Sequence, residues 1–499
     1  MKAIQLLRIT LRSLLIAAAG CGTLQAHAKI EGTWGSGTSA PQAAGTPRDF
    51  TLNASEGYIS AADGVQIYMW GYGEGATGLM QFSGPTLKVR AGETVRVTLT
   101  NRLPVTTSLL FPGQVLSANI PAGTTNNNLL TTQVLPARTA TYTFIASNPG
   151  TYLYQSGTRP TLQTEMGLVG ALIVYPANSL TQAYNHADTA FDRENLFVVS
   201  DIDANIHQAV DEKVKALRAA NAVCVRNNPT PDNCAVTVDT SARFPNYWFL
   251  NGRTSPDVFA KNFAGELPHQ PYNAVPRLHP GEKILLRMVG AGRDLHPMHH
   301  HGNNSWAIAR DGRMLSTDPH GLTATPPGPN LAMSDYTIQV VPGQTYDAIW
   351  TWSGKGLGWD MFGATCDAAL AVSPTNCRFG KYNAAGAQTA LPAIVPGAIP
   401  QRRYASTQSP ITDMYKSMPV KLPSEFELAY GEFYSGSPYL GDFGIRPVGA
   451  GNANTTGGFF HMFHSHNERE VVNGGVFPGG MMTMLVVEPF GVVIDTDQP

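Results

Sequence analysis

The chain has 499 residues, of which 43% are hydrophobic and 14% are charged, and its formal net charge is −2. This length provides two or three domains with full hydrophobic cores, and the 50 glycines and 36 prolines favour a turn-rich β protein over a disordered chain or a helical bundle. The small net charge gives no electrostatic reason to expect nucleic acid or an anionic membrane as a partner.

Residues 1–28 have the pattern of a secretory signal peptide. Basic residues precede the apolar run Leu14–Ala19, and Ala26–Ala28 is a cleavage site with small residues at both ends. The alternative is lipidation at Cys21, but the large aliphatic residue that usually stands three positions earlier is missing. We therefore expect an exported protein, periplasmic or extracellular, that starts at Lys29. No other apolar run approaches the roughly 20 residues that span a bilayer, so we predict no transmembrane segment.

Four cysteines follow the signal peptide in two close pairs, Cys224 with Cys234 and Cys366 with Cys377. An even number of cysteines in an exported chain predicts two short-loop disulfides. A metal site is the alternative, but neither pair has the tight spacing of a zinc or redox motif. Under the disulfide interpretation, no cysteine is left as a thiolate ligand for copper.

A first domain is predicted over residues 50–178, after a small, polar segment (29–48) that we interpret as a mobile leader. The runs Thr86–Arg90 and Thr94–Leu99 alternate apolar and polar residues, which predicts two half-buried strands around a turn. Further strands are expected at 141–145 and, fully buried, at 170–175.

The second domain is predicted over residues 190–499. It begins with an amphipathic helix at about 205–223, in which apolar residues recur at spacings of three and four. We interpret this helix as an addition to the domain that contributes no functional residues. An insertion at about 357–456 interrupts the domain and is consistent with a lid, a partner surface or a small subdomain.

An internal repeat relates the two domains. The spacing from Gly92 to Gly113 equals the spacing from Gly281 to Gly302, 21 positions in each case, and a glutamate follows the first glycine of each pair. Two copies of one domain are therefore expected.

Two clusters of histidines stand in the second copy. Four histidines occur within six positions, from His296 to His301, directly after the apolar run Lys283–Val289, so a strand end displays them. The pair His464 and His466 lies on a predicted strand, and residues two apart point to the same side. Imidazole is the commonest protein ligand for copper and zinc. A run of histidines without function is the alternative, which a second cluster makes less plausible.

We therefore expect four imidazoles to converge on a metal ion: His299, His301, His464 and His466. His300 and His461 should point to the opposite sides of their strands and are left out. Glu468 and Glu470 are candidate carboxylate ligands or partners that orient a ring, and the alternative for both is a solvated loop with local ion pairs.

The segment from His296 to Gly302, together with His464-Ser465-His466 and Gly479–Met482, resembles the two C-terminal copper motifs of multicopper oxidases. The resemblance covers residues 50–489 apart from the helix and the insertion. It implies an all-β fold of two cupredoxin-like Greek-key domains with a helical connection and a large insertion in the second. It also implies a blue-copper role for His296. The histidines that it assigns to a trinuclear copper cluster are His299, His301, His464 and His466.

The sequence departs from the family pattern at the blue-copper position. Ser465 stands where the family has the cysteine thiolate, Glu470 stands where it has a further histidine, and Gly475 stands where an axial methionine is common. Because a serine hydroxyl supplies neither the strong absorption nor the electron path of a thiolate, we expect no blue copper centre.

The first copy of the repeat also lacks ligands. A shift of 189 residues aligns Thr107 with His296, Leu110 with His299 and Pro112 with His301, while Gln155 and Gly157 replace the second histidine pair. The four histidines that the family's N-terminal domain supplies to the trinuclear cluster are therefore absent, and at most half of that cluster is expected.

The function predicted from the sequence is an exported multicopper-oxidase-like protein that binds a single copper, or zinc, through second-domain histidines, with His296 as a fifth candidate ligand. One alternative is a copper-dependent oxidoreductase that acts on metal ions or phenolic compounds at a mononuclear site. The other is a non-catalytic binding module of an exported assembly. A small-molecule or metal substrate and a homo-oligomer or exported protein partner are compatible with these functions. No catalytic residue is assigned.

Overall fold

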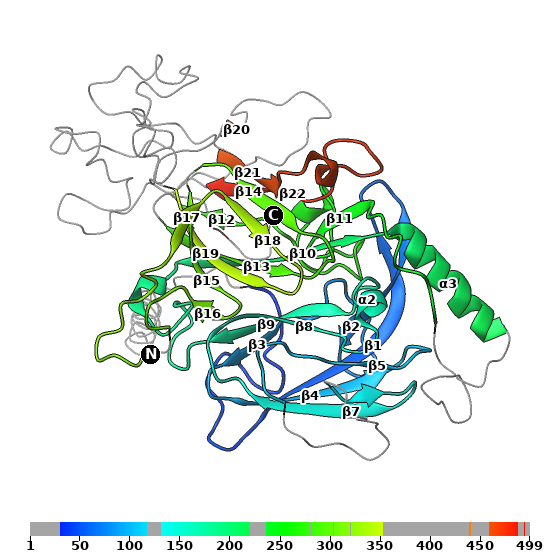
Figure 1. Cartoon of the computed structure of the whole chain (residues 1–499), viewed down its shortest axis with the longest axis horizontal. Coiled ribbons are helices and arrows are strands. Elements are labelled where there is room, and N and C mark those ends of the chain that lie inside the picture. Colours follow the sequence, from blue (N-terminus) through cyan, green and yellow to red (C-terminus); the bar gives the residue numbers. More distant parts are fainter. Residues whose placement is uncertain are drawn as a thin grey trace, which may run out of the picture.

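The computed structural model describes residues 30–116, 131–219, 236–279, 282–302, 304–319, 321–352, 439–440, 459–487 and 494. Strands dominate this part of the chain, so the predicted all-β class is confirmed (Figure 1). No helix in these ranges is long and apolar enough to cross a membrane. The predicted signal peptide, both cysteine pairs and nearly all of the insertion lie outside the described residues.

The first domain consists of a four-stranded and a three-stranded sheet, with a two-stranded ribbon beside them. The four-stranded sheet contains, in spatial order, β2 (Gln66–Glu74), β1 (Arg48–Ser60), β4 (Thr94–Asn101) and β7 (Thr139–Ile145). The three-stranded sheet contains β3 (Leu87–Arg90), β9 (Val169–Tyr175) and β8 (Gly150–Gln155), and the ribbon contains β5 (Thr107–Ser108) and β6 (Gln133–Val134). A short helix, α2 (Pro160–Gln163), follows β8.

The second domain also has two sheets. One contains β11 (Tyr247–Leu250), β10 (Arg193–Ile202), β13 (Lys283–Gly290), β19 (Thr345–Thr351), β15 (Ser305–Arg310) and β16 (Arg313–Met314), with β17 (Met333–Asp335) paired to β15. The other contains β12 (Arg277–Leu278), β22 (Met482–Val487), β21 (Phe459–Ser465), β14 (His296–His300) and β18 (Thr337–Val340), with β20 (Tyr439–Leu440) paired to β21. The described part of this domain also contains the 3₁₀ turns η1 (Ala187–Thr189), η3 (Asp257–Phe259) and η5 (Glu468–Val471).

The two domains begin in the same way. In each domain the first strand pairs in parallel with a strand that directly follows the glutamate of the repeat. These pairs are β1 with β4, after Glu93, and β10 with β13, after Glu282. A buried arginine at the start of the first strand bonds that glutamate: Arg48 Nε lies 2.6 Å from Glu93, and Arg193 Nε lies 2.5 Å from Glu282. Each arginine stands opposite the second residue after its glutamate. The sequence repeat is therefore a repeat of strand pairing as well.

Two expectations for the first domain need correction. Strand β3, which pairs with β9, is buried along its whole length and is not half-buried, and the segment before β1 is not a free leader. The reason is the segment expected to be a mobile leader, which packs on β3: Thr33 forms a bridge with Leu87, and its carbonyl accepts a hydrogen bond from the backbone N–H of Lys88.

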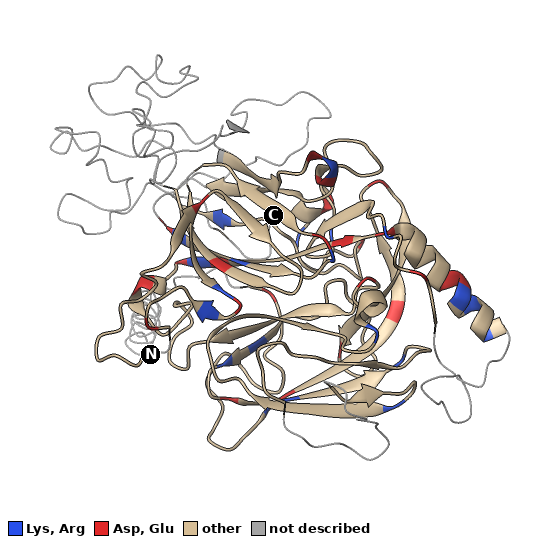
Figure 2. Cartoon of the chain, in the orientation of Figure 1, with Lys and Arg blue, Asp and Glu red and all other residues tan. Residues whose placement is uncertain are grey.

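The predicted helix is present as α3 (Ala204–Ala219), and residues 220–223 lie outside the described part. Its apolar side chains Ile206, Val210 and Val214 belong to the core of the first domain, although the helix follows the first strand of the second. Its outer face carries charges of both signs (Figure 2), including Asp211 and Lys215, whose side chains lie 2.7 Å apart. The helix thus fastens one domain to the other.

A shared core joins the domains. Leu153 and Ile173 from the first domain pack in one apolar cluster with Val198 and Phe249 from the second. Beside it, the fully buried guanidinium of Arg287 on β13 lies 3.0 Å from Glu194 and 3.8 Å from Asp347, and donates to Thr151 Oγ of β8 at 3.1 Å. One cation therefore neutralises two buried carboxylates at the domain boundary.

Replacing this cation should be costly. In Arg287→Leu the two carboxylates remain buried without their partner, and we expect a loss of about 3–5 kcal/mol in the free energy of unfolding, measured by urea denaturation. Arg96→Leu is the matched control, because Arg96 pairs with Asp49 at side-chain exposures of 48% and 42%; its unfolding midpoint should stay close to that of the wild type. Equal midpoints for both variants would contradict this account of the boundary.

Candidate metal centre

The two histidine clusters meet on neighbouring strands. Strands β14 and β21 pair antiparallel with His299 directly opposite His464. Because side chains alternate along a strand, His301 and His466 are on the same side as these two. The pairing thus converts two separate sequence motifs into one cluster.

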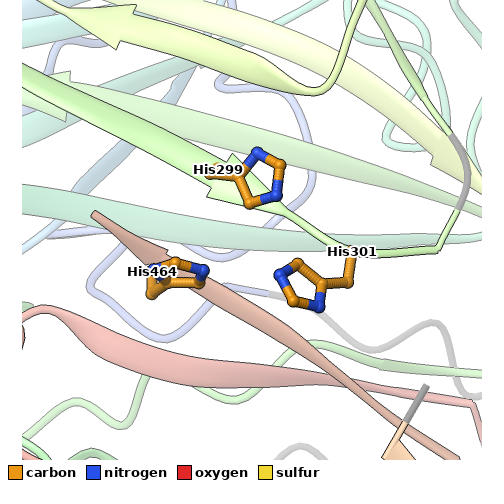
Figure 3. Close-up of side chains that lie close together, drawn as sticks. All are labelled: His299, His301 and His464. Atoms are coloured by element: carbon orange, nitrogen blue, oxygen red, sulfur yellow. The ribbon is translucent and has the colours of Figure 1, made fainter. Parts of the chain in front are cut away.

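Three of the imidazoles form a compact group. One ligand nitrogen from each of His299, His301 and His464 lies within 4.8 Å of the others. The ring centroids are 5.0 Å apart for His299 and His301, and 5.4 Å apart for each of the other two pairs. The rings converge on a common space between the two strands (Figure 3). This is the arrangement that the sequence predicts for a metal ion.

His466 lies at the edge of this group. Its ring centroid is 4.8 Å from that of His299 and 5.7 Å from that of His464, and the residue is exposed. The fourth predicted imidazole is therefore close to two of the other three and accessible from solvent.

Hydrogen bonds orient two of the rings. Nδ1 of His299 lies 2.9 Å from Oγ1 of Thr337 on β18, and Nδ1 of His464 lies 2.7 Å from the carbonyl oxygen of Ser465. Nε2 of each ring is then the nitrogen left for a metal. Such partners fix the tautomer and the ring plane of a metal-binding histidine. Thr337 carries no local signal in the sequence, because only the pairing of β14 with β18 places it beside His299.

The surroundings favour the neutral form of His299 and His464. Burial, together with the neighbouring rings of His301, His464 and His466, lowers the pKa of His299 from 6.5 to about 4. Burial also lowers the pKa of His464. Neutral imidazole is the form that binds metal, so protons compete weakly for His299 at neutral pH.

A glycine allows the chain to turn directly after the third ligand. Gly302 has a φ of +94°, and a Cβ atom there would lie 2.8 Å from Cζ2 of the buried Trp350. Any larger residue would be strained in this conformation and would collide with the tryptophan.

The fifth predicted histidine is not in this group. His296 is 1% exposed, and its two nitrogens face two carboxylates: Nδ1 lies 2.8 Å from Glu470 and Nε2 lies 3.0 Å from Asp201. Burial acts to lower the pKa of His296, but the hydrogen bonds and charges of Asp201 and Glu470 outweigh it and raise the pKa to about 9. His296 is thus an imidazolium with both nitrogens engaged.

Ser465 and Glu470 complete this second set of contacts. The Ser465 hydroxyl donates to Oε2 of Glu470 at 2.6 Å, and Glu470 is 4% exposed. Its carboxylate therefore orients His296, not one of the three convergent rings, and the solvated-loop interpretation does not hold for it. Glu468 is exposed. His300 and His461 are fully buried on the opposite side, as expected.

The first domain keeps the backbone of the site without its histidines. Leu110 and Gln155 form an antiparallel bridge, in which each N–H donates to the other's carbonyl oxygen, at 2.7 and 3.0 Å. By the repeat, this bridge corresponds to the pair His299 and His464. An aliphatic and an amide side chain occupy the two positions, so the first domain offers no imidazole there.

Comparison with known proteins agrees with this architecture. Residues 56–179 match a family model described as multicopper oxidase. Copper resistance protein A of Escherichia coli is 28% identical over 247 residues, which are 47% of this chain and 38% of that protein. The chain is therefore similar to multicopper oxidases over part of its length. The names of these matches refer to copper, and none of them refers to zinc.

Two further matches are limited in length or in sequence identity. L-ascorbate oxidase of Cucurbita pepo var. melopepo is 30% identical over 106 residues, 21% of this chain and 19% of that protein. The chain thus spans less than half the length of these curated relatives. A blue copper oxidase structure from Nitrosomonas europaea is 16% identical, with 88% of this chain and 85% of that chain covered and a TM-score of 0.47.

The charge on His296 predicts a pH dependence. Its pKa is about 9 in the folded protein and 6.5 ordinarily, so its stabilising contribution is complete below pH 6.5 and is lost as the pH rises through 9. Compared with His296→Gln, the wild type should have an advantage in the free energy of unfolding on the order of 3 kcal/mol at pH 6. The advantage should shrink at pH 10, and a constant difference across this range would count against the imidazolium.

The Thr337 hydroxyl should support copper binding. Thr337→Val preserves the shape of the side chain but removes the partner of His299 Nδ1, and we expect Cu²⁺ affinity to fall by roughly 10–100-fold in calorimetric titration. Thr98→Val is the control, since Thr98 shares a 3.1 Å hydrogen bond with Thr141 in the first domain. Equal affinities for the two variants would rule out this role for Thr337.

Proposed function

We propose that this chain is an exported multicopper oxidase relative that binds one copper ion through His299, His301 and His464, with His466 as an additional ligand. The observation that carries the proposal is the convergence of three imidazole nitrogens within 4.8 Å in the second domain. Export is inferred separately, from the signal-peptide pattern of residues 1–28.

The donor set fits copper. Imidazole nitrogens suit copper, which has a higher affinity than the other divalent first-row metals for such sites. Two nitrogens on one ion are at most about 4 Å apart, since a metal–nitrogen bond is about 2 Å long. The group within 4.8 Å therefore needs only a small rotation of the rings to close on an ion.

The residues of the chain have separable roles at this site. His299, His301 and His464 would hold the metal. Thr337 would orient the ring of His299, and the Ser465 carbonyl would orient the ring of His464. Solvent would reach the metal beside the exposed His466. A bound copper supplies a one-electron acceptor and a Lewis acid at this position. Electron entry through a thiolate is not part of the proposal, because Ser465 replaces the cysteine.

We infer that neither the blue centre nor a complete trinuclear centre forms. The blue-copper position holds Ser465, Glu470 and His296, bonded to one another. The first-domain positions hold Leu110 and Gln155, in place of two histidines. Four-electron reduction of oxygen by the family mechanism would need both centres.

A copper-dependent oxidoreductase acting on metal ions or phenolic compounds is the second candidate. The open edge favours it: His466 is exposed, and the 42%-exposed ring of Tyr336 lies 5.5 Å from His299. The names of two similar proteins, copper resistance protein A and L-ascorbate oxidase, are compatible with copper or a reducing organic compound as substrate. Glu470, which could have favoured this function as a ligand, contacts His296 instead.

Metal analysis and electron paramagnetic resonance test the proposal. The wild type loaded with Cu²⁺ should hold one copper per chain, with a signal from nitrogen ligands and without intense visible absorption. His299→Ala/His464→Ala should lose this copper, because two of three convergent ligands are removed. His186→Ala is the control, since His186 bonds the Pro326 carbonyl outside the group and should leave copper binding unchanged.

Two results would contradict the proposal. Three or more coppers per chain with intense visible absorption would indicate complete family centres. The absence of stoichiometric copper from both the wild type and the double variant would leave only the non-catalytic binding module.

A further inference from the structure

A chain of buried side-chain hydrogen bonds lies on the opposite face of the β14 and β21 pair from the convergent histidines. Ser465, Glu470, His296 and Asp201 are joined in sequence by hydrogen bonds of 2.6, 2.8 and 3.0 Å, and we refer to these four residues as the buried bridge. All four are at most 4% exposed. Because side chains alternate, the buried bridge lies on one face of the β14 and β21 pair and the convergent histidines lie on the other.

The buried bridge is directly continuous with the metal-binding residues. Ser465 stands between His464 and His466, and its carbonyl oxygen accepts the hydrogen bond of His464 Nδ1. His296 begins strand β14, which carries His299. The side-chain contact from Ser465 through Glu470 to His296 therefore ties together the two strands that present the ligands.

The far end of the buried bridge is anchored in the other sheet. Asp201 lies on β10, and its carboxylate accepts hydrogen bonds from the backbone N–H groups of Arg293 and Asp294 at 3.0 and 3.2 Å. The side chain of Arg243 also donates to it. Hydrogen bonds through Glu470, His296 and Asp201 thus connect Ser465 to the other sheet of the second domain.

The first domain has an uncharged counterpart at the same place. Ser156 follows Gln155 as Ser465 follows His464, and its hydroxyl donates to Gln163 Oε1 at 2.6 Å. The Thr107 hydroxyl, which aligns with His296, donates to the same oxygen at 2.9 Å. Side-chain hydrogen bonds therefore hold the serine of this position in both domains. In the first domain the partners are neutral, whereas in the second domain they are the charged side chains of the buried bridge.

We propose that the buried bridge is a positioning element for the copper ligands, which fixes the Ser465 carbonyl and the relative placement of β14 and β21 so that the imidazoles converge. This inference rests on the proposed copper site. It assigns to Ser465 and Glu470, which replace two family ligands, a role that needs no metal at their own position.

The two serines allow a matched test. Ser465→Ala and Ser156→Ala each remove one buried hydroxyl from the same position of the repeated domain, so thermal unfolding temperatures should fall by similar amounts. Only Ser465→Ala should alter the copper site: we expect Cu²⁺ affinity to weaken by roughly 10–100-fold, and the copper hyperfine splitting in electron paramagnetic resonance to change. Ser156→Ala should retain the wild-type affinity and spectrum.

Glu470→Gln provides a second variant of nearly unchanged shape. Glu470 Oε1 accepts from Asn467 Nδ2 at 2.8 Å while Oε2 accepts from Ser465 and His296, so an amide leaves one of these donors without an acceptor. It should change the copper spectrum in the same direction as Ser465→Ala.

The outcomes separate the two proposals. A wild type that binds copper, with Ser465→Ala and Glu470→Gln spectra and affinities indistinguishable from those of Ser156→Ala, would overturn the positioning role alone. A wild type that binds no copper would overturn the copper site and the positioning role together.

Discussion

The antiparallel pairing of β14 with β21 is the constraint on which the site depends. It sets His299 opposite His464 and, through the alternation of side chains, puts the convergent imidazoles on one face and the buried bridge on the other. A shift of one residue in this register would exchange the two faces. The convergence of the imidazoles therefore follows from backbone pairing more than from any single histidine.

Much of this could be predicted from the sequence because the determinants are local or repeated. Alternation along a strand is enough to group His299 and His301 and to exclude His300, and the glycine spacing reveals the second copy of the domain. The structure extends the repeat to residues that the sequence does not single out, such as the arginines that bond the glutamates at the start of each domain.

The remainder could not be predicted because its determinants are far apart in the chain. His296 looks like its neighbours in sequence, but its partners Asp201 and Glu470 are 95 and 174 positions away and come from β10 and η5. Thr337 is positioned only by strand pairing. The order of the segment before β1 could not be predicted for a related reason: its small, polar residues have no periodic pattern, and its backbone forms hydrogen bonds with β3.

The Arg287 cluster has a consequence for motion. Separation of the two domains would break the hydrogen bonds of Thr151 with Arg287 and Asp347 and that of Tyr175 with Glu194, and it would expose the shared apolar cluster to water. Hinge bending between the domains is therefore unfavourable, and the histidine cluster of the second domain is held in a rigid body. If the cluster binds copper as proposed, a metal ion or a reductant would reach it through movements local to the exposed edge at His466 and not through opening and closing of the molecule.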